Sequence, residues 1–433
     1  MRRIAAVGVV EMLGVVGGGL AGLLIVNVMP KEQYAQYTFL FASMTLLLGV
    51  TDLGLAYCSL PVVGERAREL PWVTGAVQRV FHWRWALLGV GMLVVVPYFV
   101  YATWEHRWSG APYWAAALLF GGLVLTTLRE HYASTVLVIL GHVPTLNKIG
   151  LKSTIIRLSL VGLVLLLPTG SFTITGIAAA TALTSVWNVL LYRQALRRHE
   201  VAETRLEPET ARGVDRDILR IARPLVIPGI FFQIQGVFTV MLVSLFGTAN
   251  MLAEVGAFGR LAMVLQVVDR VTGVLLFPAI ARAPSGPRLV STIVRVHALY
   301  LLCIGCVLVT AFWLPQYWII LLGSQYRSMT PYVWMVFLAS MLMNASGLAF
   351  RTLTVRGATS RQSYGVAVIV AVQVLYLWAY GVGSLPAVLG FNLATSLAHA
   401  GYQYLMLVLR LPEWRREKAA AVPAQAAVEP MAK

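Results

Sequence analysis

The stretch VLTTLREHYASTVLVIL (Val124–Leu140) decides the fold class, because it lies in an apolar run that extends over residues 112–140. That run is long enough to cross the roughly 30 Å hydrocarbon core of a membrane as a helix. Its middle nevertheless carries Arg, Glu and His side by side at positions 129–131. An ionisable group inside a membrane helix needs protein or water around it, so these three residues are candidates for function.

The composition of the whole chain agrees with a membrane location. Of the 433 residues, 58% are hydrophobic and only 12% are charged, and the mean hydropathy is +0.75. Apolar runs of about 20 residues recur along the sequence, whereas the alternating segments of about 10 residues that are typical of membrane β-barrels are not found. We therefore predict an all-α integral membrane protein.

The apolar runs predict twelve transmembrane helices, separated into two groups of six by a charged segment. We expect an N-terminal lobe over residues 1–192, a cytoplasmic linker over 193–221, a C-terminal lobe over 222–410 and a disordered tail over 411–433. The predicted spans are 5–28, 35–60, 83–103, 112–140, 152–168, 174–192, 222–246, 254–280, 296–318, 331–353, 364–382 and 386–409.

The net charge of +16 follows the predicted topology. With the N-terminus in the cytoplasm, every short inner loop carries Lys or Arg, and the outer loops hold only Lys31, Arg107 and Arg327. This distribution predicts cytoplasmic N- and C-termini and contacts with membrane lipids, and it argues against nucleic acid as a partner. The first span follows Arg2 and Arg3, but it is too long for a signal peptide and lacks a cleavage site, so we expect it to be retained.

Two predicted helices in equivalent places are rich in Gly and Pro. The first span contains GVVGGGLAG, which places Gly14, Gly18 and Gly22 on one face, and the seventh begins with Pro224 and Pro228. Small residues in such a pattern are equally consistent with close helix packing. The functional interpretation is that these paired helices line a substrate site and bend during alternating access. A faint internal repeat, Asp52 before Pro61 and Asp269 before Pro278, also relates the two halves.

Several stretches resemble the Wzx-type polysaccharide flippases, which belong to the MOP superfamily together with the MATE drug exporters. MPKEQYAQYTFLFASMTLLLGVTDLGLA (Met29–Ala56) is similar to the opening of that family, in which a Pro-acidic-Tyr turn leads to a helix ending in D-x-G. AEVGAFGRLAMVLQ and LLFPAIAR, between Ala253 and Arg282, resemble its second-half counterpart. LLGSQYRSMTPYVWMVFLASML (Leu321–Leu342) resembles the turn before its tenth helix.

The resemblance covers nearly the whole chain to Leu409 and implies a MATE-like arrangement of two six-helix lobes. It implies a flippase that moves undecaprenyl-diphosphate-linked oligosaccharide across a bacterial cytoplasmic membrane for surface polysaccharide biosynthesis. The polysaccharide polymerase machinery is an implied partner. Twelve spans fit this group, whereas fourteen are expected of the peptidoglycan-precursor flippases.

The ionisable residues within the spans are the candidate site. An arginine suits phosphate oxygens through its planar fork and permanent charge, so arginines in the spans are candidates for binding the diphosphate. Buried carboxylates are candidates for balancing this charge or coupling transport to an ion. The predicted substrate-binding residues are Arg129, Arg260, Arg270 and Arg351, and the predicted charge-balancing residues are Glu11, Asp52, Glu130 and Asp269.

A structural interpretation of the same charges stays open. Adjacent residues of a helix point about 100° apart, so the three ionisable residues at 129–131 cannot all face one cavity. The helix over 112–140 could also exceed the membrane thickness and leave these residues at the inner interface, where arginine snorkels. The same interpretation is favoured for Arg351, and Asp269 beside Arg270 could form a local charge pair.

Two other functions remain alternatives. A MATE-like drug or cation antiporter should have a cavity dominated by carboxylates, and a membrane polysaccharide polymerase or ligase should have a large outer loop with catalytic Arg or His residues. The sequence contains no such loop and no phosphate-binding G-x-x-x-x-G-K-[ST] motif. We expect a transporter and not an enzyme, without a cofactor or a metal site.

Overall fold

The computed structural model describes residues 2–167, 170–223, 226–275, 283–356 and 361–416, together with residues 280 and 358. This part of the chain is almost entirely helical and contains no β-strand. The first half has long helices α1 (Arg2–Val28), α2 (Lys31–Asp52), α4 (Leu70–Glu105), α5 (Ala111–Ile139), α6 (Val143–Leu166) and α7 (Thr173–Arg198). The second half has α9 (Val226–Phe246), α10 (Ala249–Leu275), α12 (Pro287–Trp313), α14 (Val333–Val355), α15 (Gln362–Tyr380) and α16 (Leu385–Arg416).

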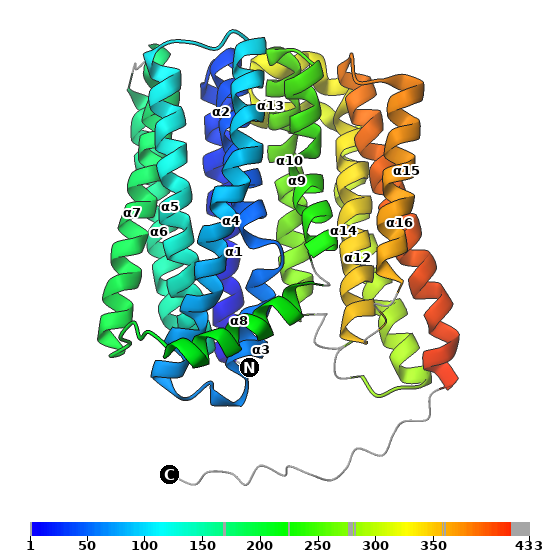
Figure 1. Ribbon diagram of the computed structural model, residues 1–433. Coiled ribbons are helices and arrows are strands. Elements are labelled where there is room, and N and C mark those ends of the chain that lie inside the picture. Colours follow the sequence, from blue (N-terminus) through cyan, green and yellow to red (C-terminus); the bar gives the residue numbers. More distant parts are fainter. Residues whose placement is uncertain are drawn as a thin grey trace.

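Short helices connect the long ones. They are η1 (Leu55–Cys58), α3 (Ser59–Val63), η2 (Gly64–Arg66), η3 (Gly170–Phe172), α8 (Pro208–Ala222), α13 (Pro315–Leu322) and η5 (Ser324–Tyr332). Figure 1 shows α8 across one end of the molecule, near the start of α1, and α13 at the opposite end. These two ends are called the α8 end and the α13 end.

Long apolar helices fall on all of the predicted spans. Within the described residues, eight helices are long and apolar enough to cross a membrane by length and composition. Helices α1, α2, α10 and α16 also coincide with predicted spans but are not among these eight. The number of twelve transmembrane helices therefore stays a prediction, while the all-helical fold is confirmed.

Several helix limits differ from the prediction. Helix α2 ends at Asp52 instead of residue 60, because Leu53 and Gly54 turn the chain with φ angles of 36° and 86°. Positive φ favours glycine, so the D-x-G sequence ends the helix. Helix α4 begins at Leu70, well before residue 83, and its extra turns pack against α3 and α8. Gln78, Arg79 and His82 interrupt the apolar sequence just before residue 83, so a search for continuous apolar runs did not include these turns.

The predicted linker and tail are partly helical. Helix α7 continues to Arg198, and α8 occupies Pro208–Ala222 as an amphipathic helix whose buried Val214 and Ile218 pack beside η1 and α4. Helix α16 continues to Arg416, and the rest of the predicted tail lies outside the described residues.

The two halves repeat one packing pattern. In the first half α2 contacts α4, α5 and α7, and α7 also contacts α5 and α6. In the second half α10 contacts α12, α14 and α16, and α16 also contacts α14 and α15. Figure 1 shows the first-half helices on one side of the molecule and α12, α14, α15 and α16 on the other. The halves meet where α1 and α2 pack against α9 and α10.

Candidate functional site

The contact between the halves is held together at the α13 end by polar groups. Lys31 at the start of α2 forms an ion pair with Glu254 of α10, with 2.6 Å between Nζ and Oε1. Gln325 of η5 donates hydrogen bonds to the carbonyl oxygens of Val26 and Met29, over 3.1 and 3.0 Å. These bonds join segments about 300 residues apart in sequence, so they fix the two halves against each other at this end.

Arg260 lies deeper in the same interface. Its guanidinium carbon is 5.9 Å from the ring centre of Tyr37 and 5.3 Å from that of Phe41, both on α2. On α1, a Cβ atom at Gly22 would lie 3.0 Å from Cδ of Arg260, so this glycine leaves the space that the arginine fills. The long side chain of Arg260 thus requires a small residue on α1 and aromatic rings on α2.

None of the described carboxylates balances the charge of Arg260. Among the described residues, no acidic side chain forms an ion pair with it. Its neighbours are neutral: Nη1 donates a weak hydrogen bond to the sulfur of Met263 at 3.7 Å, and the guanidinium also interacts with the hydroxyls of Tyr34 and Tyr37 on α2. Arg260 is eleven residues from the start of α10, or about 16 Å along the helix, which is near the middle of a 30 Å apolar layer. A cation–π contact contributes only about 0.5–2 kcal/mol, less than the cost of an isolated charge at that depth.

A second charged group joins α10 to α14. The guanidinium Nη2 of Arg351 donates a hydrogen bond to Oδ2 of Asp269 over 2.6 Å. The Arg351 side chain is 42% exposed and that of Asp269 is 18% exposed. The sequence assigned these residues to different roles, substrate binding and charge balance, and the structure pairs them with each other.

The equivalent helices of the first half carry a related group. Asp52 at the end of α2 interacts electrostatically with Arg84 of α4 and with His131 of α5. Nη2 of Arg84 is 3.4 Å from Nδ1 of His131, and Arg84 is only 4% exposed. Sequence reasoning missed Arg84, because it stands between Trp83 and Trp85 at a predicted span edge. The position of Arg84 inside the first turn of the predicted span 83–103 could have identified it as a further ionisable residue of the site.

The two charged groups occupy matching places in the repeat. Asp52 and Asp269 lie on the equivalent helices α2 and α10, and their partners His131 on α5 and Arg351 on α14 are also on equivalent helices. Asp52 is about 32 Å, and Asp269 about 30 Å, along its helix from the α13 end. Both groups therefore lie near the α8 boundary of a 30 Å layer, and Arg260 lies between that boundary and the α13 end.

The three adjacent ionisable residues of α5 enter three different environments. Glu130 accepts hydrogen bonds from Ser185 and from Nδ2 of Asn188, the latter over 3.2 Å, so it joins α5 to α7 inside the first half. His131 faces Arg84. The predicted divergence of these side chains follows from the 100° rotation per residue, and Glu130 lies away from the contact between the halves.

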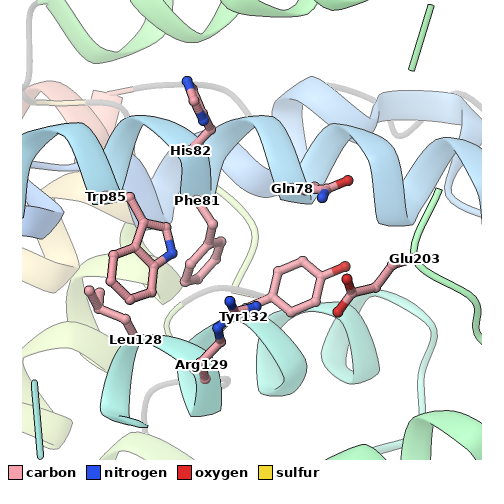
Figure 2. A pocket seen from close by; sticks show the side chains of 8 residues that line it. All are labelled: Gln78, Phe81, His82, Trp85, Leu128, Arg129, Tyr132 and Glu203. Atoms are coloured by element: carbon pink, nitrogen blue, oxygen red, sulfur yellow. The ribbon is translucent and has the colours of Figure 1, made fainter. Parts of the chain in front are cut away.

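Arg129 is exposed and lines a pocket between α4 and α5 (Figure 2). Its guanidinium carbon lies 5.8 Å from the ring centre of Trp85, and Glu203 from the segment before α8 stands across the pocket beside Tyr132. The cavity has a volume of about 180 Å³. Among the described residues Arg129 forms no ion pair, and neither Arg260 nor Arg351 lines its pocket.

The length of α5 explains why charges are tolerated at this level. Its 29 residues extend about 43 Å, some 13 Å more than the apolar layer. With the α13 end of the helix at one boundary, Arg129 reaches the opposite boundary, where a long side chain meets water. This geometry favours the interfacial interpretation for Arg129.

Four of the predicted functional residues cannot be placed by their side chains. The side chains of Glu11, Arg270 and Pro228 and the whole of Pro224 lie outside the described residues. Helix α1 is continuous through Gly14, Gly18 and Gly22, and bending at these glycines stays a prediction.

Solved structures with the same fold are membrane transporters. A multidrug resistance MATE family transporter of the MOP superfamily in an inward-facing conformation matches with a TM-score of 0.68 at 14% identity, over 94% of this chain and 96% of that one. An outward-facing conformation of such a transporter gives 0.62 at 14% identity, with 96% of each chain covered.

A MOP superfamily transporter from Pyrococcus furiosus, described by the reverse polarity of its binding pocket, gives a TM-score of 0.61 at 13% identity, over 96% of each chain. No family model matches the sequence, and no curated protein matches it. The chain therefore has the fold of the MATE transporters of the MOP superfamily.

Proposed function

We propose that this chain is a flippase that moves an undecaprenyl-diphosphate-linked oligosaccharide across a bacterial cytoplasmic membrane by alternating access. The observation that carries this proposal is Arg260, a guanidinium without a carboxylate partner among the described residues, held midway along the contact between the two halves. A diphosphate passing between the halves would supply the missing negative charge, in the bidentate geometry that arginine offers to phosphate oxygens.

The fold supports alternating access. The same fold has been solved in inward- and outward-facing conformations, and the TM-score is higher with the inward-facing one. In this chain the ion pair of Lys31 with Glu254 and the hydrogen bonds of Gln325 join the halves at the α13 end. With the α8 end in the cytoplasm, as the basic inner loops predict, this is an arrangement closed to the outside. The substrate would then enter from the cytoplasmic leaflet.

The two charged groups near the α8 boundary fit an entrance for an anionic headgroup. Asp52 with Arg84 and His131, and Asp269 with Arg351, each combine one carboxylate with at least one cation. A phosphate that approaches the entrance could exchange places with a carboxylate on a shared arginine, because both are bidentate acceptors. The exposed side chain of Arg351 is the more accessible of the two arginines.

The MATE-like cation antiporter is the alternative. It would need an excess of carboxylates where the halves meet, and the described carboxylates Asp52, Asp269 and Glu254 each face a cation. The Pyrococcus transporter described by a reversed pocket polarity supports the use of polarity as a criterion within this fold. The polymerase or ligase alternative draws no support from structural neighbours, which are transporters.

A genetic experiment tests the proposal. In a strain lacking the gene, a plasmid with the native sequence should restore surface polysaccharide. Arg260→Gln should not, and the lipid-linked repeat unit should accumulate in the cytoplasmic leaflet. Arg260→Lys should restore export only in part, because an ammonium keeps the charge but not the fork.

Arg205→Gln is the matched control, since Arg205 is exposed on the segment before α8 and should be dispensable. Drug susceptibility should not change in any of these strains. Normal polysaccharide in the deletion strain, when no redundant flippase exists, would overturn the flippase assignment. Increased susceptibility to cationic drugs with normal polysaccharide would establish the antiporter instead.

A further inference from the structure

A basic groove opens on the surface of the first half, between α6 and α7. Its volume is about 550 Å³, and its lining includes the cations Lys152, Arg193 and Arg197 and the apolar residues Trp187 and Leu190. All five side chains are exposed. Helices α6 and α7 pack against α1, α2 and α5 of the first half, and Figure 1 shows them at its outer edge, opposite the second half. The groove therefore lies away from the contact between the halves that the proposed function uses.

The apolar and the cationic residues of the groove lie at different depths, as expected of a surface that binds a lipid. Counted along α7 from Thr173, Trp187 is about 21 Å, Arg193 about 30 Å and Arg197 about 36 Å from the α13 end. Trp187 and Leu190 therefore lie within the apolar layer, Arg193 lies at its boundary and Arg197 lies beyond it. The backbone of Lys152 is about 21 Å from the α13 end of α6, and its four-carbon chain can carry the ammonium towards the boundary.

Charge distinguishes this groove from the pocket of Arg129. Glu203 lines that pocket opposite Arg129, whereas the described residues that line the groove include no carboxylate. Within the described residues, none of the three groove cations forms an ion pair. Three cations above an apolar wall suit an anion with acyl chains attached, and basic pockets between transmembrane helices are known to bind anionic headgroups.

We propose that the groove between α6 and α7 binds an anionic phospholipid of the surrounding bilayer. Arg193 and Arg197 hold the headgroup phosphate, Lys152 neutralises it from the α6 side, and the acyl chains lie along Trp187 and Leu190. The bound lipid bridges α6 and α7 on the surface of the first half that faces away from the second half.

Native mass spectrometry of the purified full-length protein in detergent tests the site. It measures how much phosphatidylglycerol or phosphatidylcholine, of equal acyl-chain length, the protein retains. The native protein should retain phosphatidylglycerol in preference to phosphatidylcholine. The triple variant Lys152→Gln, Arg193→Gln, Arg197→Gln should lose that preference. A cation near an anionic lipid contributes about 1 kcal/mol, or about fivefold in affinity, so the loss should approach roughly 100-fold at low salt.

The matched control removes three exposed arginines elsewhere at the α8 end, Arg205→Gln, Arg212→Gln and Arg216→Gln, and should keep the preference. Equal loss in both triple variants would show a diffuse charge effect and overturn the site. Retained preference in the groove variant would overturn it as well. If soluble glycerol 1-phosphate displaced phosphatidylglycerol at equal concentration, the groove would bind free anions, and the assignment to a lipid would fail.

Discussion

The guanidinium of Arg351 on α14 donates a hydrogen bond to the carboxylate of Asp269 on α10 over 2.6 Å, and the repeat places Asp52 beside Arg84 and His131 in the other half. Both carboxylates end up about 30 Å from the α13 end, at the level where the helices leave the apolar layer. Each half thus carries its own neutralised acidic residue near the α8 boundary.

The pair of Asp269 and Arg351 should couple energetically. Asp269→Asn leaves Arg351 without its partner, but Arg351 is 42% exposed and water compensates much of the loss, so we expect a cost of about 1 kcal/mol or less. The double variant Asp269→Asn, Arg351→Gln should be no less stable than the single variant Asp269→Asn. Thermal unfolding of the native protein, the two single variants Asp269→Asn and Arg351→Gln, and the double variant in detergent gives the coupling energy of the pair. Strictly additive effects on stability would show that the ion pair contributes nothing.

We expect the aromatic rings around Arg260 to contribute through cation–π contacts of their faces with the guanidinium. Tyr37→Phe keeps the ring beside the guanidinium and should support nearly normal polysaccharide export. Tyr37→Leu removes a contact of about 0.5–2 kcal/mol and should lower both export and the unfolding temperature. If Tyr37→Phe were as defective as Tyr37→Leu, the hydroxyl and not the ring would be the functional group.

The ion pair of Lys31 with Glu254 should hold the α13 end closed. Lys31→Glu places two carboxylates together and should separate α2 from α10, whereas Lys31→Glu with Glu254→Lys should restore the closure. The measurement is the labelling of Thr38→Cys by a membrane-impermeant thiol reagent in a cysteine-free background. Thr38 is 8% exposed, so labelling should be slow, rise several-fold on charge reversal and fall again in the swapped protein. Unchanged labelling in Lys31→Glu would contradict a closing role.

The docking of α8 should weaken in acid. Asp215 accepts hydrogen bonds from Arg79 and from Nε1 of Trp83, the latter over 3.1 Å. Burial opposes ionisation of Asp215, but these bonds and the charge of Arg79 outweigh it and lower its pKa. A lowered folded-state pKa means that the stabilisation is present above the unfolded value near 4 and is lost as the pH falls through the folded value.

Hydrogen exchange of the α8 amides, corrected for intrinsic rates, measures this docking. Asp215→Asn should speed exchange about fivefold at neutral pH, for a loss of about 1 kcal/mol, and should remove the acid response. Asp217→Asn is the control on the same helix, because Asp217 is 51% exposed and its ion pair is with Arg220 of α8 itself. Equal responses in the two variants would rule out a specific role for the Asp215 contacts.

The positions of the membrane helices could be predicted from hydropathy, because about 20 apolar residues in a row can satisfy their backbone groups in lipid only as a helix. The ends of the helices were harder to predict from hydropathy. The first turns of α4 pack against α3 and α8, and the polar residues Gln78, Arg79 and His82 separate them from the longer apolar run that follows.

For the candidate site, the sequence determined which residues are ionisable and their approximate depth, because depth follows from position along a helix. It did not determine their partners. Arg129, Glu130 and His131 are adjacent in sequence, yet they face a pocket, helix α7 and Arg84. Arg351 meets Asp269 from 82 residues away, and Arg260 meets the rings of α2 from the other half of the chain. Only the packing of the helices decides such partners, because the rotation of each helix about its axis is set by tertiary contacts that hydropathy does not encode.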